Sequence, residues 1–215
     1  MSSHARGPTR ALRGRFQSVR RAGLVALGGG ALFAIGFVTP PAIVPRPPAE
    51  GAVERLLGPI AGLAANVQWV RADLAFRAGR IEAFHSRARL ALELAPTSTD
   101  GWRFLAWQQA YALGSPEREP DGARRLAWVR AGLATAAAGE RRAERPAELA
   151  LLSGMILVKC ATLDPELPWP GGVEALWLAA AEHFGRARAG GSGDAARLAA
   201  ELERSARAAG AEAGR

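Results

Sequence analysis

The chain has 215 residues, of which 49% are hydrophobic, and a formal net charge of +8 with a single cysteine. This length suits one domain of ordinary size plus a tail, and the abundance of alanine over β-branched residues favours an all-α fold over a sheet. One cysteine excludes an intramolecular disulfide. Residues 1–21 hold six arginines and no acidic residue, so the rest of the chain has 22 basic and 20 acidic residues. Because the rest of the chain is nearly balanced in charge, a nucleic-acid-binding domain is not indicated.

The N-terminal part predicts attachment to a membrane. Residues 1–21 are polar and basic, and we expect a disordered cytoplasmic tail. Residues 22–38 carry no charge and are at the short end of what spans a bilayer. Because the arginines precede them, an uncleaved transmembrane signal anchor is favoured, which places the following domain in the periplasm or another extracytoplasmic space. A cleaved signal peptide and a soluble arm packed on the domain are the alternatives.

A proline-rich segment and a short helix follow the apolar stretch. Residues 39–49 contain five prolines, which predicts a semi-rigid stalk that holds a domain off the membrane surface. Residues 50–57 favour a short helix that Gly58 interrupts, after which Pro59 can open the next one. The sequence predicts one helical domain over residues 50–210.

The central stretch, residues 65–96, reads as two helices joined by a turn at Gly79 and stopped by Pro96. Apolar residues recur near helical spacing in the first helix: Val67, Val70, Leu74 and Phe76. The second helix has its own apolar series: Ile81, Phe84, Ala88, Ala91 and Leu92. A hairpin of this size cannot bury both apolar faces alone, so we expect neighbours of the same kind.

Two further helix pairs and a closing helix supply such neighbours. The pair over 99–138 has capping residues at 97–100 and an apolar stripe at Trp102, Leu105, Ala106 and Ala110. In the pair over 146–189, the first helix is apolar nearly all round and should be the most buried element. A more polar helix over 194–209 is expected to cap the domain.

The residues of the central hairpin resemble the tetratricopeptide repeat (TPR). Gly79, the run Ala91-Leu92-Glu93 and Pro96 stand where that family places its turn glycine, its Ala-Leu-Glu ending and its proline. Trp102 stands where a second repeat begins. The resemblance, to a membrane-anchored bacterial type, implies a short right-handed array of about three TPR-like hairpins with a C-terminal capping helix. It also implies binding of a protein or peptide in a concave groove, without catalysis.

Aromatic and charged side chains on the first helices of the first two pairs are candidates for that groove. Most of the six tryptophans should pack between helices, yet Trp, Tyr and Arg dominate binding energy where they are exposed. The predicted partner-binding residues are Trp69, Asp73, Phe76, Arg77, Arg103, Trp107 and Tyr111.

No cofactor, metal ion or catalytic residue is predicted. Glu82 and His85 have the Glu-x-x-His spacing of di-iron bundles, but Ala180 precedes His183 where a second copy needs glutamate, so we interpret the pair as a solvated helix face. In the loop after residue 163, Asp164 and Glu166 stand near Trp169 in the sequence, and we interpret both carboxylates as solvated loop residues. Cys160 lies in an apolar run and is expected to be buried and inert.

These features predict a membrane-anchored helical-repeat adaptor or scaffold that binds a protein or peptide and performs no chemistry. One alternative is a structural accessory subunit of a larger membrane complex, assembled through small residues at 28–36 of the transmembrane helix. A second is an enzyme whose site leaves no local sequence signature. A nucleic-acid partner is not expected.

Overall fold

In the computed structural model, residues 58–214 are described, and all regular structure among them is helical. The elements are α3 (Pro59–Arg77), α4 (Ile81–Leu94), α5 (Thr99–Trp107), η1 (Gln108–Leu113), α6 (Gly122–Glu140), α7 (Pro146–Leu163), α8 (Gly172–Gly190) and α9 (Gly193–Ala213). The all-α prediction is confirmed over this range. The expected tail, anchor, stalk and helix over 50–57 lie outside the described residues.

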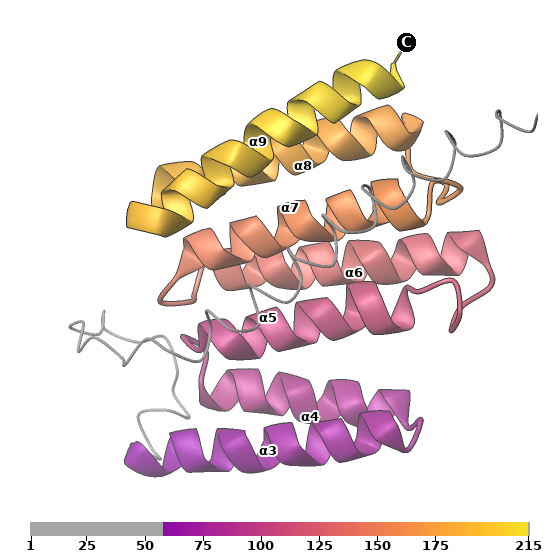
Figure 1. The fold of residues 1–215 in the computed structure, drawn as a ribbon. Coiled ribbons are helices and arrows are strands. Elements are labelled where there is room, and N and C mark those ends of the chain that lie inside the picture. Colours follow the sequence, from indigo (N-terminus) through magenta and orange to yellow (C-terminus); the bar gives the residue numbers. More distant parts are fainter. Residues whose placement is uncertain (1–57, 215) are drawn as a thin grey trace, which may run out of the picture. The chain divides into compact units, whose positions relative to one another are not determined.

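The helices follow one another in chain order, from α3 to α9 (Figure 1). Three pairs of consecutive helices pack together: α3 with α4, α5 and η1 with α6, and α7 with α8. Contacts of α4 with α5, of α6 with α7 and of α5 with α7 join the pairs, and α9 packs against α8. The three predicted pairs and the closing helix are therefore present, close to their expected bounds.

Local sequence accounts for where these helices begin and end. Pro59 opens α3, as predicted. Ser98 and Asp121 cap α5 and α6, since each side chain accepts a hydrogen bond from a backbone N–H of the first turn, at 3.2 and 2.9 Å. Gly79 has φ 71° in the turn between α3 and α4, a conformation that favours glycine.

Helix α7 is the most buried element, as the sequence predicts. Its fully buried side chains include Leu149, Ile156 and Leu157. Gly154 lets α8 approach closely, because a Cβ there would lie 2.5 Å from Cε1 of Phe184. With a mean hydropathy of 1.5, α7 is long and apolar enough to cross a membrane, but most of it is buried inside the fold, as in the core helix of a soluble domain.

The prediction that the apolar series of the first helix packs against neighbouring helices is wrong for most of its members. Val67, Val70 and Leu74 are exposed, and only Phe76 of that series turns inward. The buried face of α3 consists mainly of small side chains: Ala61, Ala65, Ala72 and Ala75. Alanine leaves room for neighbouring backbones to approach closely, so close helix packing on this face outweighs burial of the larger side chains.

A π-helical segment, η1, extends α5 where the sequence predicts a regular helix. The N–H of Gly114 donates to the carbonyl of Gln109, five residues back, at 3.0 Å. The buried side chain of Gln109 accepts a 2.6 Å hydrogen bond from Oγ1 of Thr135 on α6. Such segments change which side chains align along a helix, and this one lies beside the candidate site described next.

Candidate functional site

Three of the predicted partner-binding residues form a row along α5 and η1. Arg103, Trp107 and Tyr111 follow one another at four-residue steps, and each is half-buried. The rings of Trp107 and Tyr111 stack with centroids 3.6 Å apart and planes 11° apart. The row therefore presents two aromatic rings and a guanidinium together.

Helix α7 contributes charged groups to the same surface. Nη1 of Arg103 lies 3.4 Å from Oε2 of Glu148, and Nζ of Lys159 lies 4.9 Å from the centroid of the Tyr111 ring. We call this surface the α5–α7 face, made of Arg103, Trp107, Tyr111, Glu148 and Lys159. It combines both charge signs with two half-buried aromatic rings, which suits binding of a polar peptide with apolar side chains.

Lys159 is the sole lysine of the chain and is only 9% exposed. Within the described part, no carboxylate lies at ion-pair distance from it, and the Tyr111 ring is its aromatic partner. The Tyr111 hydroxyl donates to the carbonyl of Met155 at 3.4 Å. The Tyr111 ring compensates burial of the Lys159 ammonium, and the Met155 carbonyl compensates burial of the Tyr111 hydroxyl. The α5–α7 face is therefore an ordered surface.

The phenol of Tyr111 and the thiol of Cys160 stay protonated at neutral pH. Burial raises the pKa of Tyr111. Burial also raises the pKa of Cys160 to about 11, against the opposing charge of Lys159. Cys160 is buried, as predicted, and its thiolate form is disfavoured, so neither residue is an activated nucleophile.

The predicted partner-binding residues on α3 lie apart from the row of Arg103, Trp107 and Tyr111. Trp69 packs edge-on against Phe104 of α5 at 5.5 Å, and Phe76 packs edge-on against Phe84 of α4 at 5.2 Å. Trp69 thus joins the first hairpin to α5, whereas Phe76 joins α3 to α4 within the hairpin.

The two charged residues predicted on α3 pair with each other instead. Nε of Arg77 lies 2.7 Å from Oδ2 of Asp73, one turn apart. The structure therefore brings together Arg103, Trp107 and Tyr111, while Trp69 and Phe76 act as packing residues and Asp73 and Arg77 form a surface pair.

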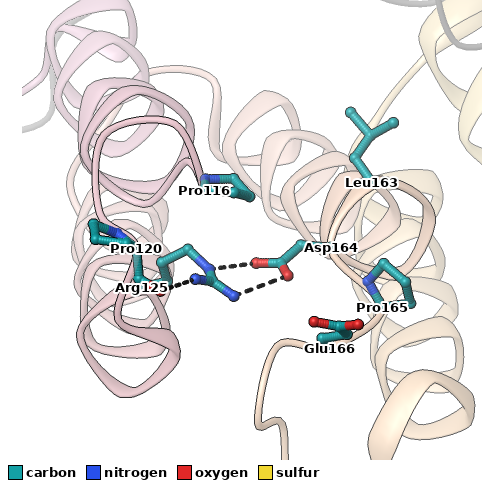
Figure 2. A pocket seen from close by; sticks show the side chains of 7 residues that line it. All are labelled: Pro116, Pro120, Arg125, Leu163, Asp164, Pro165 and Glu166. Carbon is teal, nitrogen blue, oxygen red and sulfur yellow. Dashed lines mark hydrogen bonds and ion pairs between the residues drawn. The ribbon is translucent and has the colours of Figure 1, made fainter.

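A hollow of about 420 Å³ opens where the loop before α6 meets the end of α7 (Figure 2). Its lining consists of Pro116, Pro120, Arg125, Leu163, Asp164, Pro165 and Glu166. The buried side chains of Arg125 and Asp164 form a two-pronged ion pair, Nε to Oδ2 at 2.8 Å and Nη2 to Oδ1 at 3.2 Å. The interpretation of Asp164 as a solvated loop residue is wrong, because it is 7% exposed and paired.

The remaining polar groups of Arg125 are also satisfied. Nη1 donates to the carbonyls of Pro120 at 2.8 Å and Glu119 at 3.4 Å. The hydrogen bond to Asp164 raises the pKa of Arg125, so the guanidinium stays charged. Both carboxylate oxygens of Asp164 are engaged, which leaves this carboxylate a structural link between α6 and α7 rather than a free acid or base.

The described histidines serve packing and surface roles. The ring of His85 stacks on Trp128 at 5.5 Å, and its Nε2 is buried without a hydrogen-bond partner, so the solvated face expected there is only partly present. Burial lowers the pKa of His85, with the charge of Arg89 adding to the effect. No group of three or more potential metal ligands occurs among residues 58–214.

The comparisons with known proteins add no family to this geometry. No family model matches the chain, and neither a curated protein nor a solved structure is significantly similar to it.

Proposed function

We propose that this chain is a membrane-anchored helical adaptor or scaffold whose domain over 50–210 binds a protein or peptide partner and performs no chemistry. The observation that carries the proposal is the α5–α7 face, where stacked Trp107 and Tyr111 lie beside Arg103, Glu148 and Lys159. Aromatic and arginine side chains held in a fixed arrangement are the residue types that dominate binding energy at interfaces.

Stacked helix pairs support the helical-repeat part of the proposal. Consecutive hairpins that contact their neighbours are how TPR-like arrays build an extended binding surface. In the proposed arrangement residues 1–21 are cytoplasmic, residues 22–38 cross the membrane and the helical domain faces the periplasm. The raised pKa values of Tyr111 and Cys160 support binding over nucleophilic catalysis, since both groups stay protonated near neutral pH.

Crosslinked pull-down from native membranes tests the binding face. The full chain carrying Trp107→Ala and Tyr111→Ala should lose at least about tenfold in captured partner, as expected for two interface anchors. Trp177→Ala is the matched control, because Trp177 is also half-buried but lies on α8. Unchanged capture by the double variant contradicts the proposal. A loss of helicity in circular dichroism that parallels the loss of capture also contradicts it, because it would mark both residues as core.

Extraction of membranes with alkaline carbonate tests the anchor, since an integral protein stays with the lipid. Release of the full-length chain would overturn the anchored arrangement. Replacing residues 22–38 by polyleucine separates the adaptor from the accessory subunit. An adaptor tolerates the exchange, whereas a subunit assembled through the small residues of its transmembrane helix does not.

A further inference from the structure

Helix α3 carries a continuous apolar stripe on its outer surface. Its five large aliphatic side chains are exposed by 64, 66, 41, 61 and 57%: Ile60, Leu63, Val67, Val70 and Leu74. They follow one another at steps of three, four, three and four residues, which is the a and d spacing of a coiled coil. We call this stripe the α3 seam.

The seam lies opposite the alanine face of α3. At 100° per residue, Ala61, Ala65, Ala72 and Ala75 fall on the far side of the helix, and they are buried. That alanine side is where α4 packs, and the exposure of the seam shows that no described helix covers it. The opposite end of the array differs, because the exposed surface of α9 includes Arg197, Glu201, Arg204 and Arg207. Terminal repeats need a polar outer face to remain soluble, and α3 lacks one.

We propose that the occupant of the α3 seam is a second copy of this chain, whose α3 pairs in parallel with the first. The a positions are Ile60, Val67 and Leu74, the d positions are Leu63 and Val70, and the first heptad pairs β-branched Ile60 at a with leucine at d. That combination favours two parallel strands. This pairing goes beyond the proposed function and uses a surface separate from the α5–α7 face.

The residues that flank the seam suit this arrangement. In a parallel pair, Asn66 of one copy lies near Arg71 of the other, a contact between an amide and a guanidinium that carries no repulsion. Asp73 is compensated within its own helix by Arg77, at 2.7 Å. The d position after Val70 is Arg77, so the two copies of Arg77 meet at the C-terminal end of the seam, where the ion pair with Asp73 in each copy offsets the like charge.

The area is sufficient for a specific contact. Each partly exposed aliphatic side chain contributes about 100 Å², so two seams together remove roughly 1,000 Å² of apolar surface from water, the lower limit for a biological interface. Because α3 is already folded against α4, pairing does not require a helix to form, which is the main cost for short isolated coiled coils.

Cysteine crosslinking of the full chain in native membranes tests both the partner and its orientation. In a Cys160→Ser background, Ile60→Cys and Leu74→Cys should each form a disulfide with the same residue of another copy on mild oxidation. These positions lie about 21 Å apart along the helix, so only a parallel pair brings both into contact with themselves. Arg204→Cys, exposed on α9, is the control and should form no disulfide between copies.

A second variant keeps the test independent of disulfide chemistry. Leu63→Asp with Val70→Asp should convert the detergent-solubilised dimer to monomer, with unchanged helicity. Leu163→Asp, at an aliphatic residue of α7 that is 58% exposed, should leave the dimer intact. Monomeric wild-type protein overturns the proposal. So does a seam covered by the lipid surface or by residues 22–38 of the same chain, which would give monomers with no disulfide at either position.

Discussion

Replacing Asp164 by asparagine removes one charge of the buried ion pair while keeping the size of the side chain. Arg125 is then left 8% exposed with its charge uncompensated. Removing one partner of such a pair costs ~3–5 kcal/mol. Nη1 of Arg125 keeps its carbonyl acceptors, Pro120 at 2.8 Å and Glu119 at 3.4 Å, so we expect the lower end, about 3 kcal/mol.

Thermal and urea unfolding of the full chain in detergent, followed by circular dichroism, measures this loss. For a domain of this size, about 3 kcal/mol corresponds to a decrease in Tm of roughly 6–12 °C. Glu166→Gln is the matched control, since Glu166 is exposed in the same hollow, and it should change stability by less than ~0.5 kcal/mol.

The double variant Arg125→Met and Asp164→Leu distinguishes loss of pairing from loss of packing. Replacing both charges by apolar groups of similar volume removes the uncompensated charge, so most of the stability should return. A loss below ~1 kcal/mol in Asp164→Asn would refute the view that this pair links α6 to α7. A double variant as unstable as the single one would refute it equally.

Two further predictions concern packing and pH. Gly154→Ala should lower stability by ~1–3 kcal/mol despite the better helix propensity of alanine, because the buried ring of Phe184 lies 2.5 Å from the added Cβ. Gly62→Ala has open space around the added Cβ and should instead raise stability by up to ~1 kcal/mol. Urea titrations of both variants check this pair, and equal effects would contradict it. Burial and the charge of Arg186 lower the pKa of His183 from 6.5 to about 4, so the unfolded chain binds a proton that the folded chain does not, and stability falls as the pH drops through that window. His183→Gln should therefore make the stability less dependent on pH. The free energy of unfolding lost between about pH 7 and pH 4 should become smaller by roughly 2 kcal/mol, a figure already reduced because the ring is partly exposed. An unaltered pH dependence would be the contrary result.

The helical architecture was predictable because its signals are local. Pro59, Ser98 and Gly79 each act within one turn of the helix boundary that they set, and the all-round apolar pattern of 146–163 marks the buried helix directly. Such features need no knowledge of what lies across the fold, so the sequence predicts the helix pairs and the most buried element.

The orientation of the first helix was not predictable from hydropathy. Both sides of α3 are apolar, and the larger side chains, such as Val70 and Leu74, mark the face that hydropathy would bury. The fold instead buries alanine, since close contact with α4 depends on side-chain size. Only the position of the neighbouring helix decides between the two faces.

The candidate site was predictable only where its residues lie on one helical segment. The row of Arg103, Trp107 and Tyr111 follows from helical spacing within one segment. Its partner Lys159, and the Arg125 that binds a carboxylate 39 residues away, come from different helices, and no spacing in the sequence connects them.

The contrast between the two ends of the array limits how large an assembly can grow. If an apolar stripe were present on both α3 and α9, copies could join head to tail without limit, and fibres would form. Within residues 58–214, the charged outer surface of α9 offers no complementary apolar patch, so the proposed pairing through α3 would close the complex at two chains. Each dimer would then expose two α5–α7 faces, and a partner with repeated binding motifs would gain avidity from the doubled valency.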